Sequence, residues 1–201
     1  MSQFWNERFA QDGYLYGTEP NAFLAHRYTL FPHRGHILLP GDGEGRNGVW
    51  LARRGFRVTV VDGSEVGLEK TRALAKRHGV QVETIHATLP DWTPEPSTYD
   101  GVASIYLHLP PAIRTQVHGS LARALKPGGV MLLEAFTPAQ LAFSSGGPKD
   151  EALLYTTEML AEDFAGLSID ALLELDTVLD EGHGHRGDAR VIRMIAARQR
   201  D

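Results

Sequence analysis

Residues 36–64 read HILLPGDGEGRNGVWLARRGFRVTVVDGS, and this stretch decides the fold of the chain. It begins with an apolar run, passes through a turn with three alternating glycines and continues into a helical segment that Gly55 is placed to end. A β-branched strand then covers residues 57–62 and ends in an acid, Asp62. A strand, a glycine turn, a helix and a second strand in this order predict the first half of a parallel α/β sheet.

The same alternation continues along the chain. Further strands are expected at about 80–85, 100–106, 130–136, 171–179 and 189–197, and helices at about 2–12, 22–31, 65–78, 111–125 and 157–164. The last two strands are joined by the loop 180–188, DEGHGHRGD, and are predicted to form an antiparallel pair at the sheet edge. The sequence therefore predicts a Rossmann-like, doubly wound α/β fold of three layers, with a mostly parallel seven-stranded sheet and an antiparallel C-terminal strand.

The composition fits one domain. The chain has 201 residues, of which 42% are hydrophobic, and this is enough for a single core. A net charge of -5 gives no field that would collect a polyanion, so nucleic acid is not an expected partner. The absence of cysteine excludes disulfides, thiolate metal sites and a cysteine nucleophile. There is no secretory signal pattern and no run of about 18 apolar residues, so a cytoplasmic protein without membrane contact is expected, as a monomer or homodimer.

The glycine turn and Asp62 together indicate a ligand site. In open parallel sheets, ligands bind beyond the carboxyl ends of the strands, where the strand order reverses. Gly41, Gly43 and Gly45 would let the backbone pass close to a ligand, and Asp62 is placed to accept hydrogen bonds from ribose hydroxyls. This pairing predicts a cofactor that carries a nucleoside.

Two other functions remain open from the residues alone. The string that starts at Gly43 also satisfies G-x-G-x-x-G, so an NAD(P)-dependent oxidoreductase is the nearest rival. Counted from Gly41, which directly follows the strand, the third glycine position is Arg46, and this weighs against that rival. A non-catalytic cofactor-binding domain is the second alternative.

Longer motifs resemble a known family. The stretch 37–64 resembles the first two cofactor motifs of class I S-adenosylmethionine-dependent methyltransferases, and YDGVASIYLHLP at 99–110 and LKPGGVMLLEAF at 125–136 resemble their fourth and fifth strands. The G-x-G-x-G-R-N form and FWNERFAQDGYLYGTEP at 4–20 are similar to the small tellurite-resistance and thiopurine-methyltransferase-like branch. GGPKDEALL at 146–154 and DEGHGHRGDARVI at 180–192 fit a bacterial subgroup of it.

The resemblance implies S-adenosylmethionine as cofactor and a single methyltransferase domain with three parts. Residues 1–30 would form a helical lid, 36–136 the cofactor-binding core, and 137–201 the acceptor side. The chain departs from the family at Leu39, where an acid is usual, and at 87–89, where an acid often faces the adenine. The expected cofactor-binding residues are Trp5, Tyr16, Gly41, Gly43, Gly45, Asn47, Asp62, Gly63, Ser64, Thr88, Leu89 and Ser104.

Three residues are candidates for catalysis or acceptor binding. His108 follows the fourth strand at the expected mouth of the site, and His185 and Arg186 lie where the related branch carries a His-Arg pair near the acceptor. An imidazole can take a proton from a thiol, and a guanidinium binds oxyanions. No Cys or carboxylate pattern completes a metal site with the histidines, so no metal is expected. The expected reaction is in-line methyl transfer to a small soluble acceptor such as a thiol, a tellurium or selenium oxyanion or a related metabolite.

Overall fold

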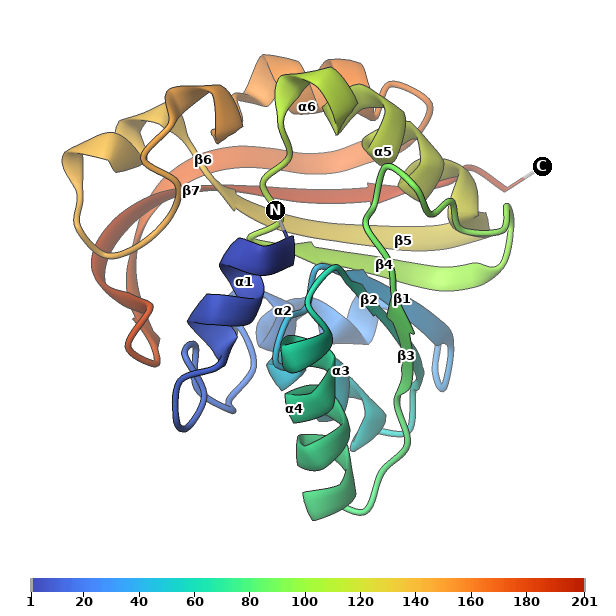
Figure 1. The fold of residues 1–201 in the computed structure, drawn as a ribbon. Helices are drawn as coiled ribbons and strands as arrows, with labels where there is room; N and C mark the ends of the chain where they lie inside the picture. The colour runs from blue at the N-terminus through green and yellow to red at the C-terminus, as the bar shows by residue number, and fades with distance from the viewer. Residues whose placement is uncertain (1, 201) are drawn as a thin grey trace.

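The computed structural model describes residues 2–200, which form the predicted three-layer α/β domain (Figure 1). The helices are α1 Ser2–Phe9, α2 Ala22–Arg27, α3 Arg46–Ala52, α4 Glu65–Arg77, α5 Pro111–Ala124 and α6 Thr157–Asp163. The strands are β1 His36–Pro40, β2 Arg57–Asp62, β3 Glu83–His86, β4 Tyr99–Ile105, β5 Leu125–Phe136, β6 Ser168–Glu181 and β7 His185–Ala197. Within residues 2–200, no helix has the length and apolar character needed to cross a membrane.

The seven strands form one sheet in the order β3-β2-β1-β4-β5-β7-β6. The pairs among β1 to β5 are parallel, whereas β7 runs antiparallel to both β5 and β6. This arrangement confirms the predicted mostly parallel sheet with an antiparallel C-terminal strand. The strand order reverses between β1 and β4, so the carboxyl ends of these two strands flank the position where a ligand is expected.

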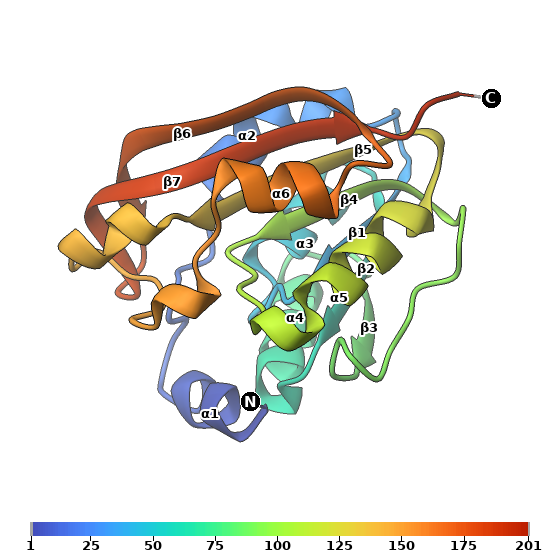
Figure 2. The same cartoon turned by 90° about the horizontal axis from the view of Figure 1, so that it is seen from above.

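Helices cover both faces of the sheet because its strands are apolar on both sides. Leu38 of β1 packs into the core on the face covered by α5 and α6, while its neighbours Ile37 and Leu39 pack into the core beneath α2 and α3. Figure 2 shows α5 and α6 together on one face, with α2 and α3 behind the sheet. Alternate side chains of a strand point to opposite faces, so near-continuous apolar runs are typical of such doubly covered strands.

Several element bounds differ from the sequence prediction. β3 begins at Glu83 rather than at 80, and α2 ends at Arg27, followed by a 3-10 turn. β5 begins at Leu125 rather than at 130, because residues 125–129 form an irregular extension of the strand beside β4. The largest difference lies in the C-terminal hairpin, where pairing continues from Leu179 and Gly187 to Glu181 and His185. The loop expected at 180–188 is thereby reduced to a turn at residues 182–184.

Candidate active site

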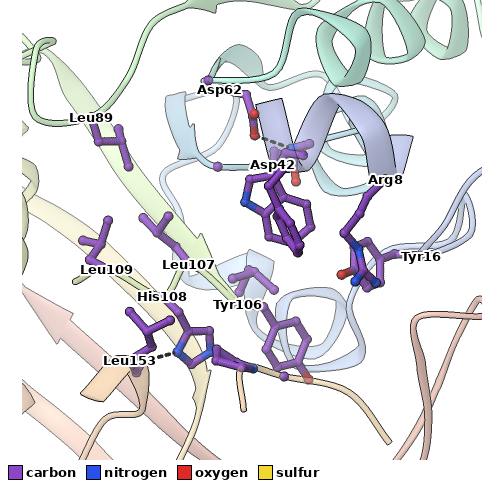
Figure 3. A pocket seen from close by; sticks show the side chains of 18 of the residues that line it. Arg8, Tyr16, Asp42, Asp62, Leu89, Tyr106, Leu107, His108, Leu109 and Leu153 are labelled. Atoms are coloured by element: carbon purple, nitrogen blue, oxygen red, sulfur yellow. Dashed lines mark hydrogen bonds between the residues drawn. The ribbon is translucent and has the colours of Figure 1, made fainter. Parts of the chain in front are cut away.

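A pocket of about 750 Å³ lies beyond the carboxyl ends of β1, β2 and β4. Its other walls come from α1, the turn between β6 and β7, and the irregular segment after β5. In Figure 3, Leu89, Leu107 and Leu109 lie on one side of the pocket, and Arg8 and Tyr16 lie on the opposite side. The volume is within the range of about 300 to 1,000 Å³ that is typical of small-molecule sites.

The glycine turn after β1 is held by the carboxylate of Asp62. Gly41 and Gly43 have positive φ angles of 68° and 58°, which glycine adopts without strain. Asp62 accepts hydrogen bonds from the Gly43 N–H at 2.9 Å and the Ser64 N–H at 2.8 Å. Burial raises the pKa of Asp62. The acid that the sequence singled out therefore shapes the turn and also lines the pocket.

Nine of the twelve predicted cofactor-binding residues line this pocket: Trp5, Tyr16, Gly41, Gly43, Asn47, Asp62, Gly63, Thr88 and Leu89. Gly45, Ser64 and Ser104 do not line it. Gly45 has a φ of 85°, and a Cβ there would lie 2.5 Å from the Thr71 hydroxyl, so a close approach to α4 explains this glycine. Ser64 caps α4 by accepting from Gly67 N at 3.1 Å, and Ser104 is buried in β4.

Two acids of the glycine turn were missed by the sequence analysis. Asp42 accepts hydrogen bonds from the side chain of Asn47 at 2.9 Å and from Gly48 N at 2.8 Å, which fixes the start of α3. Burial raises the pKa of Asp42 to about 6. Glu44 pairs with Lys70 at 2.8 Å and accepts from the backbone of the N-terminal segment. The signal for both was present, since acids occupy the two positions between the three glycines.

The N-terminal segment packs directly on the glycine turn. The Phe9 ring lies against Gly43, where a Cβ would come within 2.8 Å of it, and Trp5 stacks on Phe9 with ring centroids 5.3 Å apart. Lys70 donates to the carbonyls of Gln11 and Gly13 at 2.8 and 2.7 Å. These contacts place α1 over the pocket, as expected of a lid, and whether it moves stays a prediction.

The turn between β6 and β7 completes this wall. Gly184 N donates to Leu15 O at 3.0 Å, and the Tyr16 ring lies 4.4 Å from the His185 ring. Two segments 169 residues apart in sequence thus meet at the pocket, because Leu15 and Tyr16 contact the turn at Gly184 and His185.

His108 lines the pocket, but both of its ring nitrogens are engaged by the backbone. Nδ1 lies 2.7 Å from Leu153 O, and Nε2 accepts from Phe136 N at 3.2 Å (Figure 3 shows the bond to Leu153). Burial lowers the pKa of His108 to about 4, so the ring is neutral near pH 7. A neutral ring with its Nε2 lone pair occupied ties β5 to the segment at Leu153, and this geometry does not favour the predicted role of His108 as a base.

His185 and Arg186 are separated by the structure. His185 is buried, lines the pocket and has its Nδ1 3.3 Å from a carboxylate oxygen of Glu181. Burial lowers the pKa of His185, which keeps the ring neutral. With Nδ1 donating to Glu181, Nε2 is left as a proton acceptor. Arg186 is exposed and does not line the pocket, so its position counts against the predicted acceptor contact.

A buried polar network behind the pocket was not predicted. Glu181 accepts from Arg46 at 2.8 Å and from Asn21 at 3.0 Å, and Asn21 also donates to Glu134 at 2.6 Å. Arg46 stands at the position where a dinucleotide fold has its third glycine, and here it is buried in an ion pair. Tyr106 borders the network with a φ of 54°, a backbone conformation that is strained for a bulky residue and typical of functional sites.

Comparisons with known proteins give a domain match and structures of similar fold. Residues 37–129 match the family model described as a methyltransferase domain. No curated protein sequence matches the chain. Among solved structures, a protein from work on the conversion of a disulfide bond into a thioacetal group during echinomycin biosynthesis aligns with a TM-score of 0.77 and 20% identity, over 99% of this chain and 92% of its own.

Two further structures share the fold. TehB from Haemophilus influenzae aligns with a TM-score of 0.72 and 16% identity, over 98% of this chain and 67% of its own. The 1,6-didemethyltoxoflavin-N1-methyltransferase of Burkholderia thailandensis, solved with 1,6-didemethyltoxoflavin and S-adenosylhomocysteine, aligns with a TM-score of 0.63 and 20% identity, over 88% and 75% of the two chains.

The matched residues 37–129 include the glycine turn, Asp62 and four of the strands that build the pocket. Gly41 and Gly43 line the pocket with bare backbone, and Asp62 stands at the end of β2, so the residues present fit a nucleoside cofactor. With its seven-stranded sheet and its pocket at the switch point, the chain has the Rossmann-like fold of class I methyltransferases, and its residues 37–129 match a methyltransferase domain.

Proposed function

We propose that this enzyme methylates a small soluble acceptor whose nucleophile is a thiolate or a tellurium or selenium oxyanion. The pocket must hold both the cofactor and the acceptor within about 750 Å³, which suits a small molecule. The sequence motifs that resemble the tellurite-resistance and thiopurine-methyltransferase-like branch support the same class of acceptor.

The observation that carries the proposal is how the two pocket imidazoles are held. His108 has both nitrogens bonded to the backbone. His185 is neutral and oriented by Glu181, so its Nε2 is available as a weak base. A weak base suffices to deprotonate a thiol, because the thiol pKa of about 8.5 lies near neutral pH. The same weak base cannot efficiently deprotonate an aliphatic hydroxyl, whose pKa is far higher.

The residues around the pocket divide the remaining tasks. When bound, S-adenosylmethionine supplies an electrophilic methyl group on a positively charged sulfur. Asp62 and the Gly43 turn would hold its ribose, and Thr88 and Leu89 would border its adenine. Trp5 and Tyr16 cover the pocket and exclude water. His185 Nε2 would take the proton of the acceptor, and the protein otherwise acts by alignment.

The test uses acceptors of one shape and different nucleophiles. Purified enzyme is given methyl-labelled S-adenosylmethionine with thiophenol, phenol or aniline, and separately with tellurite or selenite. We expect thiophenol to be methylated at least about tenfold faster than phenol or aniline. The thiol ionises without a strong base to a good nucleophile, whereas phenol stays protonated and the neutral nitrogen of aniline is a weaker nucleophile. Faster transfer to phenol or aniline, or label found only in added protein or RNA, would contradict the proposal.

A further inference from the structure

The N-terminal helix carries a cation that has no counter-charge. Arg8 of α1 lines the pocket, and no carboxylate in residues 2–200 lies within ion-pair distance of its guanidinium. Its Nε is buried without a hydrogen-bond partner. The aromatic rings of Phe4 and Trp5 lie 5.5 and 5.8 Å from the guanidinium carbon and hold it in place. A partly buried guanidinium that has an unpartnered buried Nε and no carboxylate beside it is suited to bind an anion.

The other two pocket cations are already engaged. Arg46 already forms an ion pair with Glu181 at 2.8 Å, and only its Nη1 is buried without a partner. Lys149 is exposed and donates to the carbonyl of Phe143 at 3.1 Å. Arg8 also lies beside Tyr16, where its charge opposes the rise in the pKa of Tyr16 that burial causes. Burial is the larger effect and leaves the pKa of Tyr16 above its ordinary value, so the hydroxyl stays protonated and can donate a second hydrogen bond to an anion bound by Arg8.

The position of this pair matches one end of the cofactor. In Figure 3, Asp62 lies between the side of the pocket that carries Leu89 and the side that carries Arg8 and Tyr16. S-adenosylmethionine is elongated, with adenine at one end, ribose next to it and the methionyl carboxylate at the other end. With the ribose at Asp62 and the adenine at Leu89, the carboxylate end extends toward Arg8.

We propose that Arg8, together with the hydroxyl of Tyr16, binds the carboxylate of the methionyl half of S-adenosylmethionine. Because Arg8 belongs to α1, the charge of the cofactor then holds this helix over the pocket. The inference concerns the cofactor alone and stands whichever acceptor the enzyme methylates.

The test compares two ligands that differ only in the amino-acid part. S-adenosylhomocysteine carries the carboxylate, and 5'-methylthioadenosine keeps the adenosine and the sulfur but lacks the amino-carboxyl end. Both are titrated calorimetrically into the wild type and into Arg8→Gln, Arg8→Lys and Tyr16→Phe. Arg53→Gln is the matched control, because Arg53 is exposed beyond the end of α3 and does not line the pocket.

We expect Arg8→Gln to raise the Kd of S-adenosylhomocysteine by about ten- to a hundredfold, the range for losing a hydrogen-bonded charge pair. The Kd of 5'-methylthioadenosine should stay within about twofold of the wild-type value. Arg8→Lys should fall between, since it keeps the charge but loses the planar fork. Tyr16→Phe should show a smaller loss of the same selectivity, and Arg53→Gln none.

A second readout separates binding from folding. In the wild type, S-adenosylhomocysteine should slow hydrogen exchange at residues 4–16 more than 5'-methylthioadenosine does, and in Arg8→Gln the two ligands should protect equally. Equal loss of affinity for both ligands would assign Arg8 a structural role and overturn the inference. Unchanged affinity for both, with a raised KM for an anionic acceptor, would place the acceptor's anion at Arg8 and also overturn it.

Discussion

Glu181 is the residue whose replacement tests the buried network most directly. Its carboxylate accepts hydrogen bonds from Arg46, His185 and Asn21. A glutamine of the same shape removes the charge and turns an N–H group toward donors. Glu181→Gln therefore leaves Arg46 as a buried, uncompensated cation and releases the ring of His185.

The size of the effect follows from the pKa of Glu181. Burial raises this pKa, but the hydrogen bond from His185 and the charge of Arg46 outweigh burial and hold it at about 2, below the ordinary 4.5. A shift of this size corresponds to about 3 kcal/mol of folding stability at pH 7. Because the folded-state pKa is depressed, the stabilisation is complete above pH 4.5 and is lost as the pH falls toward 2. At pH 4, about 1 kcal/mol of it should already be gone.

The measurement is urea denaturation of the wild type and of Glu181→Gln at pH 7 and pH 4. We expect Glu181→Gln to lower the free energy of unfolding by about 3 kcal/mol at pH 7, with a smaller difference at pH 4. In thermal denaturation the loss at pH 7 corresponds to a Tm lower by about 6 to 12 °C. Glu174→Gln is the control on the same strand, since Glu174 pairs with Arg190 at the surface and should matter by at most about 1 kcal/mol. A Glu181→Gln variant within about 0.5 kcal/mol of the wild type, or a difference independent of pH, would refute the reasoning.

Three further predictions concern the pocket. Asp62→Ala should weaken S-adenosylhomocysteine binding by about 1 to 3 kcal/mol in calorimetry, because charge-assisted hydrogen bonds that shape the turn are lost; an unchanged Kd would remove Asp62 from the site. His185→Ala should lower the methyl-transfer rate with little change in cofactor affinity, whereas Arg186→Ala should retain the rate; the reverse pattern would show that Arg186 reaches the acceptor. Because the pKa of His108 is about 4, the rate between pH 5 and 8 should carry no limb from this ring, and a His108→Gln variant that abolished such a limb would contradict its neutral, bridging role.

The fold was predictable because its signals are local. The glycine turn follows β1 immediately, and the acid at 62 comes at the end of the next strand, so a single stretch of 29 residues contains both. Parallel pairing then brings these two strand ends to the same edge of the sheet. The helical spacing of the N-terminal aromatic residues predicted a docked helix, and the family resemblance predicted a lid over the cofactor; the contact of Phe9 with Gly43 was not predicted.

The buried network could not be predicted in this way because its contacts are long-range. Arg46 and Glu181 lie 135 residues apart, and Asn21 and Glu134 lie 113 apart. Each of these side chains alone has the sequence pattern of a solvated surface residue. Only the docking of the C-terminal hairpin beside the glycine turn places them together, and no local period or motif encodes that contact.

The contrast between His185 and Arg186 follows from one error in the expected secondary structure. In a loop, two neighbouring side chains can both face an acceptor, and the Gly-rich sequence of 180–188 indicated such a loop. The structure extends β7 back to His185, which pairs with Glu181 of β6. Successive residues of a strand face opposite sides, so once His185 points into the pocket, Arg186 must point away from it. The pocket therefore presents the neutral imidazole of His185 without the neighbouring guanidinium, and under the proposed function we expect this to favour an acceptor that ionises readily by itself.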